Sequence, residues 1–143
     1  MRFASDRGDF VSLESNHDVS STDLLISVAV QWRDFAGRVQ VWILRQVWID
    51  FCEQLTRLEA ERRGSATVES MSPKELRLTI RSTDSAGHMA VDGQIGYRGV
   101  FGETLLLFAP IDFDPSVLPQ LVREACGMFE MSGAAARTDS RIP

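Results

Sequence analysis

Hydrophobic and polar residues alternate along the first third of the chain, a pattern typical of half-buried β-strands. Every second residue from Leu24 to Trp32 is apolar, and the alternation returns from Arg38 to Leu44 after a turn at Asp34–Gly37. A shorter stretch, Phe10 to Glu14, predicts a strand before them. We expect the two longer strands to pair as a hairpin.

After this hairpin, the spacing of the apolar residues changes from every second residue to the 3.6-residue period of a helix. One helical stripe collects Trp48, Phe51, Cys52, Leu55 and Leu58. Gly64 stands where a left-handed C-cap belongs. Asp114 and Pro115 predict the start of a second helix, with aspartate as N-cap and proline at the first helical position.

Between the predicted helices, turn residues separate four further strands. The predicted strands are Ala66–Ser70, Leu76–Arg81, Met89–Tyr97 and Leu105–Ala109. Ser72-Pro73 and Asp84–Gly87 supply turns. Because Leu105–Ala109 is almost wholly apolar, we expect this strand to be covered on both faces.

These elements predict an α+β domain in the order β-β-β-α-β-β-β-β-α. We expect an antiparallel sheet of six or seven strands with the two helices packed on one face. The order of the strands within the sheet does not follow from the pattern. The domain should span residues 8–130, and the alanine-rich segment 131–143 should be a disordered tail.

Composition narrows the functional classes only modestly. The 143 residues, 44% hydrophobic and 24% charged, suit a single globular domain. A net charge of -5 argues against a nucleic-acid binder and is compatible with a basic protein partner. The chain has no signal-peptide pattern at its start and no apolar run near the roughly 20 residues of a membrane span. We therefore expect a cytoplasmic protein that contacts neither nucleic acid nor membrane.

Glycines recur every third residue at Gly93, Gly96, Gly99 and Gly102. A phosphate-binding loop would require a following Gly-Lys-Ser/Thr and a helix, which this segment lacks. The repeat favours a bulged strand or a flexible hairpin end. Beside it, an exposed patch of Tyr97, Arg98, Val100 and Phe101 has the residue types favoured at interfaces.

The aspartate, histidine and serine residues of the chain predict no catalytic, cofactor or metal site. A hard cation would need Asp92, Asp112 and Asp114 to converge. His17 and His88 lack companions at metal-ligand spacing, and we expect His88 to bond to backbone at a strand edge. Ser85, His88 and Asp84 lie within one turn, which is a poor geometry for a catalytic triad. The chain is therefore not expected to be an enzyme.

The two cysteines and one tryptophan each allow two interpretations. Cys52 and Cys126 lie in apolar helical patterns and favour free thiols over a disulfide, because no disulfide framework surrounds them. Trp42 shares a face with Arg38 and Gln40. It is either covered by loops or anchors a partner.

Several segments resemble the WapI-like immunity proteins. The similar segments are Phe35–Arg38, the helix from Trp48 to Leu58, Glu69–Pro73, Asp84–Gln94 with its Gly87-His88 pair, and Ile111–Asp114. The similarity covers roughly residues 8 to 126. It implies a cytoplasmic partner of a secreted or wall-associated toxin, which binds the toxic C-terminal domain, commonly a nuclease. The family offers no shared set of binding residues.

The expected contacts with such a toxin are therefore chosen from this chain alone. The candidates are Asp50, Glu53 and Glu61 on the first helix, and Tyr97, Arg98 and Phe101 beside the glycine repeat. The acidic residues are equally compatible with an ordinary solvated helix face. A ligand-binding or regulatory module of the same fold is the alternative function, since a fold does not fix a function.

Overall fold

The computed structural model describes residues 1–16 and 22–139, and the side chains within this range up to residue 128. The first sheet contains β1 (Arg2–Ala4), β2 (Phe10–Asn16), β3 (Leu24–Trp32) and β4 (Phe35–Ile43). The second contains β5 (Ser65–Glu69), β6 (Leu76–Ser82), β7 (Met89–Gly99) and β8 (Gly102–Phe113). The helical elements are α1 (Arg45–Glu61), the 3-10 turn η1 (Pro115–Val117) and α2 (Leu118–Asp139).

The α+β class, the two helices and the antiparallel pairing are confirmed, whereas the single sheet of six or seven strands is wrong. Each sheet has four strands in chain order, β1-β2-β3-β4 and β5-β6-β7-β8. The additional strand, β1, has three residues, too few for alternation to reveal it. The four strands that follow α1 in the chain form their own sheet instead of extending the first.

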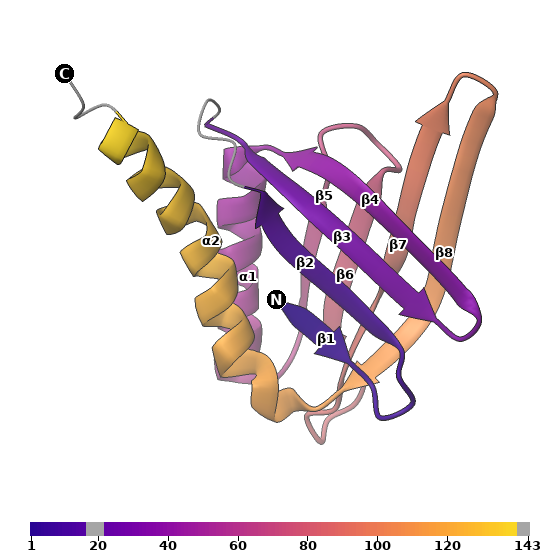
Figure 1. The fold of residues 1–143 in the computed structure, drawn as a ribbon. Helices are drawn as coiled ribbons and strands as arrows, with labels where there is room; N and C mark the ends of the chain where they lie inside the picture. The colour runs from indigo at the N-terminus through magenta and orange to yellow at the C-terminus, as the bar shows by residue number, and fades with distance from the viewer. Residues whose placement is uncertain (17–21, 140–143) are drawn as a thin grey trace.

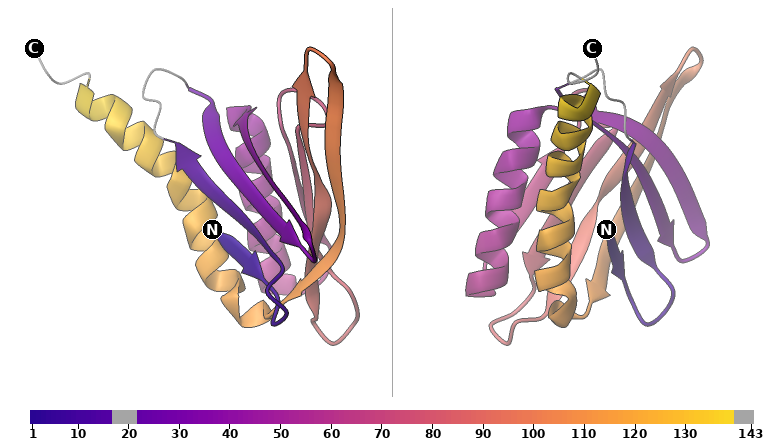
Figure 2. Two further views of the ribbon diagram at one scale, coloured as in Figure 1. Left: turned by 45° about the vertical axis from the view of Figure 1, so that its right-hand side comes forward. Right: turned by 60° about the vertical axis from the view of Figure 1, so that its left-hand side comes forward.

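The sheets face each other, and the helices lie side by side next to them (Figure 1). The main contacts of α1 are with β5 and α2, so the predicted placement of both helices on one sheet face is replaced by packing beside two sheets (Figure 2). The hairpin of β7 and β8 extends beyond the rest of the molecule, at the opposite side from the helices.

The core lies between the sheets and the helices. The predicted stripe of α1 is buried at Trp48, Phe51, Leu55 and Leu58, while Cys52 is half-buried. The indole Nε1 of Trp48 donates to the carbonyl of Ala125 in α2 at 2.9 Å. This bond joins the two helices inside the core.

The predicted β3–β4 hairpin is confirmed, but its turn is shorter than expected. Trp32 pairs with Phe35, so the turn consists of Arg33 and Asp34. Gly37 lies within β4, where an added Cβ would be 2.8 Å from Ile95 Cδ1 of β7. The two sheets approach each other closely at this glycine.

Of the two predicted helix caps, the N-cap Asp114 is confirmed and the C-cap Gly64 is wrong. Asp114 is an N-cap, because its Oδ1 accepts from the Ser116 N–H at 2.9 Å, although it caps η1 directly before α2. The C-cap of α1 is Arg62 and not Gly64. Arg62 has a left-handed φ of 57°, and its N–H donates to the Leu58 carbonyl at 2.8 Å. Its guanidinium is held by two hydrogen bonds, which Nε donates to the Glu59 carbonyl and Nη1 to the Pro115 carbonyl.

The expectation that Leu105–Ala109 is covered on both faces is wrong. Leu105 is 40% exposed and Leu107 is 66% exposed. The register places Ala109 and Pro110 opposite the single residue Asp92, a β-bulge that reverses which residues of β8 face inward. Leu106 and Phe108 face the core before the bulge, Ile111 and Phe113 after it.

The disordered tail over residues 131–143 stays a prediction. The structure continues α2 to Asp139, and residues 140–143 lie outside the described part. Residues 17–21 also lie outside the described part. No helix in the described ranges is long and apolar enough to cross a membrane.

Candidate functional site

The end of the β7–β8 hairpin carries the most exposed apolar side chains of the described residues. Val100 and Phe101 form the two-residue turn and are 96% and 104% exposed, and Tyr97 on β7 is 70% exposed. Leu105 and Leu107 add exposed apolar area on β8, on the opposite face of the hairpin from Tyr97, because Leu105 pairs with Gly96 whereas Tyr97 pairs with Thr104. These five residues are called the hairpin surface below. Burying such a surface against a partner would be favourable, because apolar and aromatic area dominates binding energy.

Glycines build this hairpin, as the bulged-strand interpretation of their repeat predicts. Gly99 pairs with Gly102 to close the turn. At Gly96 an added Cβ would be 2.5 Å from the carbonyl oxygen of Lys74 in the β5–β6 loop. At Gly93 it would be only 1.9 Å from the carbonyl oxygen of Arg77, with φ at 155°. Gly93 and Gly96 therefore allow close backbone packing, and Gly99 and Gly102 flank the turn.

Charged side chains border the hairpin surface as ion pairs. Arg98 is bonded to Glu103 through Nη2 at 2.9 Å and Nε at 3.1 Å. Lys74 approaches the other oxygen of the same carboxylate at 3.7 Å. On the outer face of the same sheet, Arg81 pairs with Asp92 at 2.9 Å. Arg98, a predicted contact, is thus exposed but already paired with Glu103, which orients it across the strand.

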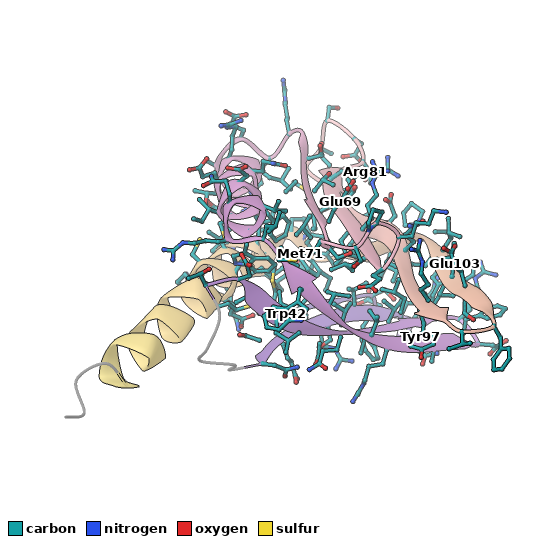
Figure 3. All side chains as sticks on the ribbon, turned by 90° about the horizontal axis from the view of Figure 1, so that it is seen from above. Trp42, Glu69, Met71, Arg81, Tyr97 and Glu103 are labelled. Atoms are coloured by element: carbon teal, nitrogen blue, oxygen red, sulfur yellow. The ribbon has the colours of Figure 1, made fainter. Side chains whose placement is uncertain are left out.

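The other predicted contacts lie on a different surface. Asp50, Glu53 and Glu61 are exposed on α1, and Asp50 accepts from Gln46 Nε2 at 2.9 Å within the helix. Figure 3 shows Tyr97 and Glu103 at the opposite side of the molecule from α1. The structure therefore separates the six predicted residues into an acidic helix face and the end of the β7–β8 hairpin.

A shallow hollow of about 400 Å³ continues from the hairpin surface along the outer face of the second sheet. Thr79, Asp92 and Gln94 line its polar side, and Leu107 and Pro110 line its apolar side. Sequence reasoning missed Leu105 and Leu107 as surface residues because the apolar run looked buried. Pro110 was the available signal, since proline within a strand is typical of an edge or a bulge.

A second hollow, of about 470 Å³, lies where the β1–β2 loop meets the end of β8. Arg7, His88, Asp112 and Asp114 are among its lining residues. Asp92 is not among them, and the described residues contain no group of three or more potential ligands that could hold a metal ion. The three aspartates considered for a hard cation are therefore not brought together.

His88 bonds to backbone as predicted, because its carbonyl accepts from the Thr83 N–H at 2.8 Å, and it also bonds to the side chain of Asp84. Its Nδ1 lies 2.5 Å from Asp84 Oδ2, and its backbone N–H donates to Asp84 Oδ1 at 3.2 Å. The hydrogen bond and the negative charge of Asp84 raise the pKa of His88, and the bond from His88 lowers the pKa of Asp84. Both side chains are exposed, and the pair closes the β6–β7 turn.

The remaining open side-chain questions are settled by burial and contacts. Cys52 of α1 and Cys126 of α2 are free, as predicted. Burial, with the neighbouring Cys126, raises the pKa of Cys52 to about 12. Trp42 is half-buried, and its carbonyl accepts from the Met71 N–H at 2.8 Å (Figure 3).

Comparison of the chain with models of protein families, with curated proteins and with solved structures finds no match.

Proposed function

We propose that this protein is a cytoplasmic immunity protein that binds the toxic C-terminal domain of a cognate secreted or wall-associated toxin. The toxic domain is a nuclease in this proposal, and a one-to-one complex covers it. The support from sequence is the resemblance of residues 8 to 126 to the WapI-like immunity proteins. The observation that carries the proposal is the hairpin surface, in which Val100 and Phe101 are almost fully exposed.

The hairpin surface fits protein recognition better than binding of a small molecule. Small molecules are usually enclosed in concave pockets, whereas this surface projects from the molecule. Tyr97 and Phe101 provide aromatic side chains of the kind that dominate protein interfaces, and Arg98 provides a charged rim. Because these residues are exposed in the free protein, binding would not require the core to open.

Net charge supports rapid capture of a basic partner. The chain has 20 acidic and 15 basic residues, and Asp50, Glu53 and Glu61 are exposed on α1. A basic nuclease domain would be attracted over distances up to about the Debye length, roughly 10 Å at 0.1 M salt. The association rate should therefore fall as salt is added, and an unchanged rate would exclude this steering.

The test is a calorimetric titration into the toxic domain encoded beside this chain, together with rescue of growth in cells that produce the toxin. The double variant Tyr97→Ala, Phe101→Ala should weaken binding by at least about thirtyfold, since two interface aromatics that contribute at least about 1 kcal/mol each sum to about 2 kcal/mol. Phe35→Ala is the matched control, because Phe35 is 58% exposed at the tip of the other hairpin. Equal affinity of the double variant and the control would exclude the hairpin surface as the binding site.

A ligand-binding or regulatory module is the second candidate. It is favoured by the 470 Å³ hollow, where four aspartates, with Arg7 and His88, could hold a polar or cationic ligand. If the Arg7→Ala variant rescues growth as strongly as the unchanged protein, this hollow is not the site that neutralises the toxin. Absence of both binding and rescue with the unchanged protein would exclude the immunity function and leave this candidate.

A further inference from the structure

One edge of the second sheet is an open strand. β8 ends the sheet order β5-β6-β7-β8, and β1 contacts it. That contact includes Phe3 against Phe113, with ring centroids 5.1 Å apart, near the end of β8. The first half of β8 stands at the margin of the molecule with no strand beyond it (Figure 1). At the other edge of this sheet, β5 packs against α1.

The register shows which backbone groups this edge presents. Gly99 and Gly102 flank a two-residue turn and therefore form a hydrogen-bonded pair. Alternation along the ladder makes Thr104 and Leu106 bond to β7 as well. In agreement, the N–H of Gly96, which is opposite Leu105, donates away from β8 to the Glu75 carbonyl at 2.9 Å. The N–H and C=O groups of Leu105 and Leu107 consequently point out from the edge.

The features that usually protect an edge strand are missing from this half of β8. Natural edges are blocked by lysine, by proline, by bulges or by a covering element. Between residues 103 and 108 the sole charged side chain is Glu103, whose charge is paired with Arg98 and Lys74. The bulge and Pro110 begin only afterwards. An apolar edge of this kind is expected to pair with another strand.

We propose that the free protein forms a symmetric dimer in which the β8 edges of two copies pair antiparallel about Leu106. In this register Leu105 of each copy lies opposite Leu107 of the other, and each of these pairs exchanges both backbone hydrogen bonds. The four leucine side chains share the outer face, where opposite residues are close enough to pack. Glu103 lies opposite Ala109, so no like charges meet.

The inference does not depend on the proposed function, because it concerns the free protein alone. It has one consequence for that function, since dimerisation would cover Leu105 and Leu107 of the hairpin surface. A contact through one strand edge is smaller than a standard stable interface. We therefore expect a dissociation constant on the order of 10 to 100 µM.

Sedimentation velocity of the full chain from micromolar to near-millimolar concentration tests the dimer. The unchanged protein should shift from monomer to dimer across this range. Leu107→Lys should weaken the dimer about a hundredfold, tenfold for each copy, with unchanged thermal unfolding. Leu44→Lys is the control, because Leu44 is 45% exposed but lies just before α1, and it should leave the dimer unchanged. A monomer at every concentration, or equal dimerisation of the Leu107→Lys variant, would overturn the proposal.

Oxidative cross-linking tests the register in a chain whose Cys52 and Cys126 are replaced by serine. A mixture of Leu105→Cys and Leu107→Cys chains should form a disulfide-linked dimer, and each variant alone should cross-link poorly. If Leu105→Cys alone cross-links as well as the mixture, the pairing about Leu106 is wrong. If no combination cross-links, the β8 edge is not the dimer contact. These results leave toxin binding untouched, since that is measured in the separate titration.

Discussion

Replacing Trp48 with phenylalanine should separate the contribution of one buried hydrogen bond from that of the aromatic core. Trp48 is fully buried, and its indole donates to the Ala125 carbonyl at 2.9 Å across 77 residues of sequence. Its ring also packs on Phe51, with centroids 5.1 Å apart. Phenylalanine keeps an aromatic ring in the core but removes the donor and part of the volume.

The expected loss has two comparable parts. A typical intramolecular hydrogen bond contributes about 1 kcal/mol net. The missing part of the indole leaves a cavity of roughly 40 Å³, which costs about 1 kcal/mol. Trp48→Phe should therefore lower the free energy of unfolding by about 2 kcal/mol, and α2 should lose part of its attachment to α1.

Urea unfolding followed by far-UV circular dichroism measures this loss without relying on tryptophan fluorescence. Trp42→Phe is the matched control, because Trp42 is half-buried and should lose less than about 1 kcal/mol. A loss below about 0.5 kcal/mol for Trp48→Phe, or one equal to that of the control, would refute the reasoning. In that case the bond to Ala125 would not stabilise the packing of the helices.

Three further outcomes follow from local contacts. Gly96→Ala should destabilise the protein by about 1 to 3 kcal/mol in urea unfolding, because its Cβ would overlap a backbone oxygen of the β5–β6 loop, and an unchanged midpoint would contradict this. An NMR titration should give His88 a pKa above the ordinary histidine value, and Asp84→Asn should lower it, whereas equal values in both proteins would exclude the pair. Folding raises the pKa of His88 and lowers that of Asp84, so the pair should stabilise the protein between the two folded pKa values. The stabilisation from protonated His88 is lost as pH rises through its folded pKa. The stabilisation from ionised Asp84 is lost as pH falls through its folded pKa. Alkylation of Cys52 at neutral pH should be much slower than that of a free thiol, because its pKa is raised, and fast alkylation would show that Cys52 is not buried as described.

The candidate site was partly predictable. Tyr97, Arg98 and Phe101 follow from residue types beside a glycine repeat, since glycines at this spacing favour a hairpin end, and they are exposed at one end of the β7–β8 hairpin. Leu105 and Leu107 could not be assigned to the same surface, because an apolar run does not say which of its faces is covered. The bulge at Ala109 and Pro110 decides that question by reversing the facing of β8.

The sequence by itself determined the local elements of this protein. Alternation located β3, helical periodicity located the buried stripe of α1, and Asp114-Pro115 located the start of the second helical segment. Each depends on interactions within a few residues, so each is written in the pattern of a short window.

Only the tertiary structure decided how these elements combine. Two sheets form instead of one, Gly37 marks their close approach, and the helices share the bond from Trp48 to Ala125. The face of β8 left open to solvent is decided at the same level. These features depend on contacts between residues far apart in the chain, and many pairings of the same amphipathic elements satisfy the same local pattern.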